Sequence, residues 1–171
     1  MTKMVAMDHV FGNADAPVTV TEYGDYQCPY CAGAAPVLRT LVEESDGQVR
    51  LIFRNFPLFE IHPYALTAAL AAESTASAGV FWDMHHVLFK KQDRLEDAFL
   101  RHYAEAVGAD PALATGEAAQ QFAPKVQEDY AAGVACGIAG TPSLLINDTP
   151  YEGRIELAEL RRATSLTLRR A

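Results

Sequence analysis

Hydrophobic and polar residues alternate in two stretches near the start of the chain, and a helical pattern separates them. Residues 18–23 are β-branched and alternating, between Pro17 and Gly24, which predicts a buried strand. Residues 29–45 place apolar side chains on one helical face, and residues 49–56 form a second strand pattern. Strand, helix and strand in this order predict a βαβ unit with a right-handed crossover.

The long stretch after the second strand has helical periodicity, and strand patterns return only near the end of the chain. Residues 143–147 predict a buried strand, residues 151–155 a second strand of a hairpin, and residues 156–170 a closing helix. Because strands from both ends should share one sheet, we predict an α/β fold with an inserted helical domain, in a single compact unit. The predicted ranges are 1–61 and 137–171 for the core and 62–136 for the insertion.

The amino-acid composition argues against several classes of function. The chain has 171 residues, half of them apolar, which is enough for one domain with a substantial core. Acids exceed bases by 22 to 14, so we expect no nucleic-acid partner. No apolar run approaches the ~20 residues of a transmembrane helix. The first residues lack the apolar centre of a signal peptide, so we expect a cytoplasmic protein, or an extracytoplasmic or periplasmic one if a leader was removed.

The most informative motif is the pair Cys28 and Cys31 in the tetrapeptide CPYC. Two cysteines at this spacing form a redox pair, contribute half of a metal site, or pack as unrelated core thiols. A structural zinc site needs four ligands, and neither Cys136 nor the histidines supply a second paired motif. We therefore predict no metal.

The redox interpretation follows from the position of the pair. Cys28 comes after a strand and directly before a helix, where free N–H groups and the helix dipole favour a thiolate. Cys31 lies one turn further on the same face, from which it can attack a mixed disulfide formed by Cys28. Pro29 fits the first turn of the helix, because its missing N–H is no loss there.

A second motif, Thr141-Pro142, directly precedes the strand predicted at 143–147. A proline at that place is unusual unless its ring and missing donor serve a purpose. A cis bond at such a proline is typically found in a tight turn, and it would turn the backbone of Thr141 toward the cysteines and an extended substrate segment. The alternative is an ordinary turn proline.

Several segments, in order along the chain, resemble the DsbA-like branch of the thioredoxin superfamily, over roughly residues 8–165. They are GNADAPVTVTEYGDYQCPYC, RNFPL followed by HPYALTAALAAE, FWDMHHVLF, and GIAGTPSLLIN. The resemblance implies a thioredoxin fold with a helical domain inserted between its second and third core strands. It also implies an enzyme that is a protein disulfide oxidoreductase.

The resemblance also implies roles for individual residues. Cys28 matches the exposed nucleophile, Cys31 the buried resolving cysteine, and Pro142 the cis-proline opposite them, with Thr141 before it. Glu22 matches a buried acid beneath the disulfide, and burial would raise the pKa of its carboxyl. Such a group suits a proton acceptor for Cys31. The alternative for Glu22 is an edge-strand residue that faces water.

Tyr30 departs from the strongly oxidising member of the family, which has a histidine at this place. Tyrosine cannot be cationic, so we expect it to favour the Cys28 thiolate less than a protonated histidine does. CPYC is also the tetrapeptide of glutaredoxins, whose potentials lie well below that of DsbA. Pro29 and Tyr30 are therefore predicted to tune the potential, and the direction of electron flow stays open.

The leading hypothesis is an exchange of the Cys28–Cys31 disulfide with cysteine-containing protein substrates, by oxidation or isomerisation. No organic cofactor is expected, because the cysteine pair is itself the redox centre. Glutathione or a membrane redox partner is a further partner that the sequence leaves open. One alternative is a glutathione-linked cytoplasmic disulfide reductase, and another is a non-catalytic peptide-binding or chaperone module on the same fold.

Three further residues lie near these motifs. Cys136 is expected to be a small buried hydrophobe, with a third redox thiol or a glutathionylation site as the sharper hypothesis. Asp25 is expected to cap the turn or the start of the helix and is given no catalytic role. His62 is expected, by family analogy, to approach the thiols.

Overall fold

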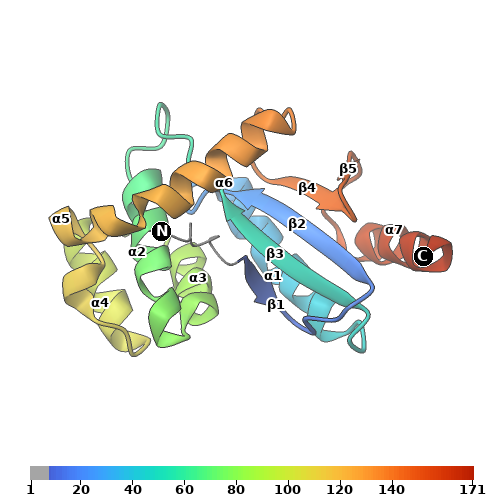
Figure 1. Ribbon diagram of the computed structural model, residues 1–171, viewed down its shortest axis with the longest axis horizontal. Helices are drawn as coiled ribbons and strands as arrows, with labels where there is room; N and C mark the ends of the chain where they lie inside the picture. The colour runs from blue at the N-terminus through green and yellow to red at the C-terminus, as the bar shows by residue number, and fades with distance from the viewer. Residues whose placement is uncertain (1–7) are drawn as a thin grey trace, which may run out of the picture.

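The computed structural model describes residues 8–171 (Figure 1), so the prediction on a leader, and residues 1–7 of the predicted core, lie outside it. The strands are β1 (His9–Phe11), β2 (Val18–Gly24), β3 (Val49–Asn55), β4 (Ser143–Ile146) and β5 (Thr149–Tyr151). The α-helices are α1 (Pro29–Glu43), α2 (Ala65–Ser74), α3 (Phe81–Lys90), α4 (Asp97–Ala106), α5 (Gly116–Ala119), α6 (Ala123–Ala135) and α7 (Leu157–Arg170). Short 3-10 helices are η1 (Ala76–Ala78), η2 (Pro111–Leu113) and η3 (Gln120–Phe122). In the described part of the chain, no helix has both the length and the apolar character that crossing a bilayer requires.

The strands form one mixed sheet in the order β1-β3-β2-β4-β5. β2 runs parallel to β3, with Glu22 opposite Phe53, and antiparallel to β4, with Glu22 opposite Leu144. β2 is therefore a central strand whose backbone groups are paired on both sides. Strands from both ends of the chain share this sheet, which confirms the predicted α/β fold class with helices inserted between β3 and β4.

Two strands differ from the sequence prediction. β1, which was not predicted, pairs antiparallel with β3 over three residues, too few for a periodic pattern to be recognised. The second strand of the hairpin is β5 and not residues 151–155. Asn147 and Asp148 both have positive φ angles, 45° and 66°, so a tight two-residue turn closes the hairpin and β5 begins immediately after it.

Helices cover both faces of the sheet. On one face, Leu38 of α1 and Leu160 of α7 belong to the same buried cluster as Val20 of β2. On the other face, α6 crosses the ends of β2 and β3 (Figure 1), where Tyr130 stacks on Phe56 with ring centroids 4.5 Å apart. The helices α2 to α5 gather beyond this end of the sheet, so the inserted segment lies beside the end of β2 that leads to the cysteines.

The core of the inserted helices is continuous with the cysteine pair. Both cysteines belong to a buried cluster that includes Met84 and Leu88 of α3 and Leu95 of the following loop. Burying each of these large side chains stabilises the fold by about 1.5–3 kcal/mol. The helices α2 to α6 fall within the predicted range 62–136, while the exact boundaries between core and insertion stay a prediction.

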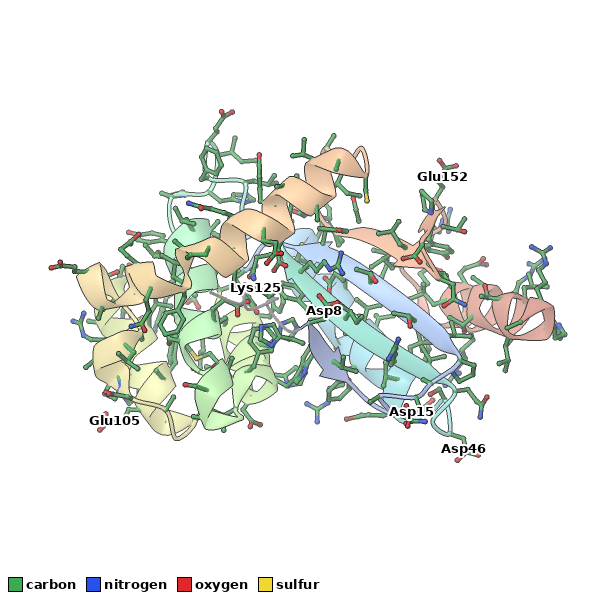
Figure 2. All side chains as sticks on the ribbon, in the orientation of Figure 1. Asp8, Asp15, Asp46, Glu105, Lys125 and Glu152 are labelled. Carbon is green, nitrogen blue, oxygen red and sulfur yellow. The ribbon has the colours of Figure 1, made fainter. Side chains whose placement is uncertain are left out.

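A buried polar network fixes the inserted helices to the sheet. The side-chain amide of Asn55 in β3 donates to Glu73 of α2 at 2.7 Å and to Asp129 of α6 at 3.0 Å. Lys125, labelled in Figure 2, forms an ion pair with Asp129, and His9 of β1 contacts Glu73 at 2.8 Å. Because these charges are paired and hydrogen-bonded, the network holds four elements in one arrangement.

Candidate active site

Cys28 is the residue that caps the N-terminus of α1. Its backbone is extended, with φ −73° and ψ 121°, and the helix begins at Pro29. The N–H of Cys28 donates to the carbonyl of Asp25 at 3.1 Å, and its own carbonyl accepts from the N–H of Ala32 at 3.1 Å. The thiol therefore lies at the positive end of the α1 dipole, beside the unpaired N–H groups of the first turn.

The loop at Thr141 meets this helix terminus. The Sγ atom of Cys28 lies 3.6 Å from the carbonyl oxygen of Thr141, although 113 residues separate the two. The Thr141-Pro142 peptide bond is cis. The structure thus brings the two sequence motifs together. Cys31 is wholly buried, and Cys28, matched to an exposed nucleophile in the sequence, is itself only 3% exposed because it packs against the Thr141 carbonyl.

The environment of Cys31 strongly favours the neutral thiol. Burial raises the pKa of Cys31 far above its ordinary value, and Glu22 raises it further when its carboxyl is ionised. A hydrogen bond from the Thr141 hydroxyl to the thiolate would act in the opposite direction. That hydroxyl is buried and has no other partner within residues 8–171. Cys31 therefore needs a base before it can act as a nucleophile.

Glu22 lies on the central strand β2 and is wholly buried, so the alternative of an edge residue facing water is wrong. Neither carboxylate oxygen has a hydrogen-bond partner within residues 8–171. Burial raises the pKa of Glu22 from 4.5 to about 8. Gly24 leaves room for this carboxyl, since a Cβ there would lie 3.3 Å from Glu22 Oε1 and 2.5 Å from the Phe53 ring.

Asp25 organises the turn between β2 and α1. Its Oδ1 atom accepts from the N–H of Gln27 at 2.7 Å, the turn cap that the sequence predicts. Its Oδ2 atom accepts from the N–H of Leu58 at 2.9 Å and contacts His62 Nδ1 at 2.7 Å. The structure therefore places His62 on this carboxylate. No sequence pattern pointed to the pairing, because 37 residues separate the two side chains.

Side chains of the inserted segment hold the same turn from its other side. The amide of Gln92 donates to the carbonyls of Tyr26 at 2.9 Å and Cys28 at 2.7 Å. The Tyr26 hydroxyl lies 3.0 Å from Nδ1 of the buried His85. Burial lowers the pKa of His85 well below its ordinary value, so the ring that pairs with the Tyr26 hydroxyl is neutral. Sequence reasoning missed Gln92, although it is the one uncharged residue in the run KKQDR.

The surface beside Cys28 is open and partly apolar. Tyr30 is 79% exposed, so nothing in the described chain covers the residue between Pro29 and Cys31. An open depression of ≈ 500 Å³ lies next to it, lined by Tyr30, Gly33, Ala34, Thr141, Pro142 and Ile155. A chain bound at Cys28 would contact both Tyr30 and the Thr141-Pro142 loop.

The other potential metal ligands do not gather around the cysteine pair. Cys136, at the end of α6, is exposed, so the prediction of a small buried hydrophobe is wrong. Its spacing of three residues from Gly133 would continue the buried face of α6, but the helix ends at Ala135 and Cys136 lies beyond it. Across residues 8–171, no three His, Cys, Asp or Glu side chains form a group that could hold a metal ion.

Comparison with known proteins identifies relatives in sequence. The sequence model of the thioredoxin family matches residues 4–164. The Na+/H+ antiporter NhaA 3 of Salinispora tropica is 39% identical over 154 residues, which are 90% of this chain and 24% of that protein. NhaA 1 of Salinispora arenicola is 37% identical over 159 residues, 92% of this chain and 24% of that protein. The chain thus spans about a quarter of the length of these curated relatives.

Solved structures agree with the sequence comparison. Oxidised BdbD from Bacillus subtilis is 26% identical with a TM-score of 0.81, over 94% of this chain and 92% of that chain. A thioredoxin-like oxidoreductase from Silicibacter pomeroyi is 27% identical with a TM-score of 0.81, over 96% and 93%. The thiol-disulfide exchange protein α-DsbA2 from Wolbachia pipientis shares the fold, with 22% identity and a TM-score of 0.80 over 92% and 85%.

Proposed function

This chain belongs to the thioredoxin family, among its DsbA-like thiol–disulfide oxidoreductases, and we propose that it exchanges the Cys28–Cys31 disulfide with cysteine-containing proteins. One observation carries the proposal. Cys28 lies at the helix terminus against the Thr141 carbonyl, while Cys31 lies buried, with its pKa raised by burial and by Glu22. The two thiols thus have the different environments that a nucleophile and a resolving cysteine need.

In the oxidising direction, a substrate thiolate attacks Cys28 Sγ and breaks its bond to Cys31. Cys31 leaves as a thiolate and takes up a proton, and a mixed disulfide joins Cys28 to the substrate. A second substrate thiolate then attacks the substrate sulfur of that bond and releases Cys28 as a thiolate. Two electrons pass from the substrate dithiol to the cysteine pair, and no further cofactor takes part.

In the reducing direction, Cys28 attacks the substrate disulfide and Cys31 resolves the mixed disulfide. Glu22 supports this step as a proton acceptor, because a carboxyl with a pKa raised to about 8 exchanges its proton near neutral pH. The buried Thr141 hydroxyl is available to donate to the thiolate that forms on Cys31.

The decisive experiment uses serine variants of the three cysteines. With a fluorescent peptide that contains a disulfide, Cys28→Ser should abolish exchange, and Cys31→Ser should accumulate a mixed disulfide on Cys28, because one peptide thiol is released and no second protein thiol resolves the bond. Cys136→Ser is the matched control and should behave as the parent. Full exchange by the Cys28→Ser protein would contradict the proposal. Holdase activity that survives loss of both active-site cysteines, with no exchange in the parent, would support the chaperone alternative instead.

The direction of electron flow has its own test. The exposed, neutral Tyr30 supplies no positive charge beside the thiolate, so we propose a weaker oxidant than DsbA. A reduction potential of the Cys28–Cys31 pair well below ~−120 mV agrees with this proposal, and one near ~−270 mV indicates a reductase. Rapid turnover of glutathione mixed disulfides would favour the glutathione-linked reductase.

A further inference from the structure

The side-chain amide of Gln92 bridges two backbone carbonyls of the turn between β2 and α1, residues 25–28, which we call the redox turn. Its Nε2 atom donates to Tyr26 O at 2.9 Å and to Cys28 O at 2.7 Å, using both of its hydrogens. These two carbonyls bracket Gln27, so the bridge restrains the backbone directly before the reactive thiol. Gln92 belongs to the loop between α3 and α4, and it joins that loop to the first residue of the CPYC motif.

The loop that carries Gln92 is itself firmly held. Its neighbours Lys91 and Asp93 are exposed, whereas Gln92 is turned inward. Leu95 is buried in the same cluster as the cysteines, and the Tyr103 hydroxyl donates to the carbonyl of Arg94 at 2.9 Å. A rigid support of this kind is what a side chain needs in order to position another group accurately.

The amide also acts on the charge beside the thiol. The carbonyl oxygen of Cys28 carries a partial negative charge within the same residue as Sγ, and it already accepts from Ala32 N. A second donor offsets more of that charge and so favours the thiolate. Loss of the donor also frees the backbone that sets the 3.6 Å contact between Sγ and Thr141 O.

We propose that Gln92 is a positioning residue that sets the reactivity and potential of Cys28 through these two carbonyls. The inference rests on the thiol–disulfide exchange proposed above, but it is tested on the thiol itself. Cys28 alkylation by iodoacetamide is measured on the reduced Cys136→Ser protein, and its rate does not depend on whether any protein substrate is turned over. Failure of the exchange reaction and failure of this inference are therefore separate results.

The test compares three substitutions in that background. Gln92→Met keeps an unbranched, neutral side chain of similar length without a donor, and Gln92→Glu likewise lacks the amide donors. Both should lower the alkylation rate constant roughly 3- to 10-fold, the size of one or two lost hydrogen bonds. Because the reduced form is destabilised, the ratio of oxidised to reduced protein in a glutathione buffer should rise by a similar factor. Gln92→Lys restores a donor and should recover the parental values.

The control is Gln121→Met, since within residues 8–171 that amide donates only to the nearby carbonyl of Ala118. It should leave both readouts unchanged. A Gln92→Met protein with the parental rate and potential overturns the inference. The inference is also overturned if all three variants, Gln92→Met, Gln92→Glu and Gln92→Lys, lose the same share of the alkylation rate and this loss only parallels their loss of thermal stability. That result would indicate that Gln92 acts through packing. If Gln92→Met does not fold, as judged by near-UV circular dichroism, the comparison of Gln92→Glu with Gln92→Lys decides.

Discussion

The carboxylate of Asp25 and the imidazole of His62 lie 2.7 Å apart and join the redox turn to the segment that leads into α2. The Asp25 side chain is fully buried, whereas His62 retains 18% exposure. The same carboxylate also accepts from the backbone of Gln27 and Leu58. One buried acid therefore satisfies three donors from two separate parts of the chain.

Asp25→Ala should lower the free energy of unfolding by roughly 2–4 kcal/mol, because it leaves buried donors without an acceptor. Urea unfolding followed by circular dichroism measures this. Asp110→Ala is the matched control. In the described part of the chain that exposed carboxylate accepts only from the N–H of Ala112, so its loss should cost about 1 kcal/mol or less. Equal losses in the two variants would contradict the assignment.

Glu22 should make stability depend on pH. Its pKa is about 8 in the folded protein and near 4.5 when unfolded, so the unfolded chain ionises first as the pH rises. The contribution of the neutral Glu22 carboxyl to the free energy of unfolding is fully present below about pH 4.5. As the pH rises from there to about 8, it is lost by about 1.4 kcal/mol per pH unit. Glu22→Gln lacks this dependence and should be more stable than the parent by roughly 2–4 kcal/mol at pH 7.5. Parallel pH profiles for the two proteins would be inconsistent with a buried, neutral Glu22.

The same substitution should slow the attack of Cys31. When Cys28 carries a coloured aromatic thiol as a mixed disulfide, its release reports resolution by Cys31. Glu22→Gln should slow this release roughly 10- to 100-fold near pH 7, because the proton acceptor is gone. Glu43→Gln is the control, since Glu43 is half exposed and, among the residues that the structure describes, pairs only with Arg39. An unchanged release rate would remove Glu22 from the mechanism.

Two helical glycines should respond in opposite ways to alanine. A Cβ on Gly133 would lie 2.7 Å from the Phe56 ring and 3.0 Å from Tyr23, whereas one on Gly33 would meet nothing within 4 Å. Gly133→Ala should therefore destabilise the protein by about 1–3 kcal/mol through overpacking of α6 on the sheet. Gly33→Ala should stabilise it by about 0.5–1 kcal/mol. Thermal unfolding of the two variants tests the packing of both helices, and a stable Gly133→Ala protein would contradict the close approach of α6.

The sequence predicted most of the sheet because its main strands are strongly patterned. Residues 18–23, 49–56 and 143–147 correspond to β2, β3 and β4, and Pro29 correctly indicated the start of α1. β1 and the true place of β5 were missed, since each has only three residues and is defined by its partner strand. Short edge strands depend on tertiary pairing, which periodicity does not record.

The site was predictable to the extent that its residues follow local motifs. Cys28 and Cys31 stand out through their spacing, and Thr141-Pro142 through a proline before a strand. The contacts of Asp25 with His62 and of Gln92 with Cys28 span 37 and 64 residues, and no local pattern connects such pairs. Cys136 was misjudged because residue type alone favours burial for cysteine, whereas its place after the last turn of α6 exposes it.

The position of β4 next to β2 has a consequence during synthesis. The strand that leads to the cysteines gains its second neighbour only after residue 146 has been translated, and the carbonyl that faces Cys28 is encoded 113 residues downstream. At about 5–20 residues per second, the ribosome needs roughly 6–23 seconds to cover that interval. Throughout that interval, the nascent chain carries two thiols beside an incomplete sheet. The redox potential of the surroundings therefore decides whether the two cysteines are oxidised before the enzyme is complete.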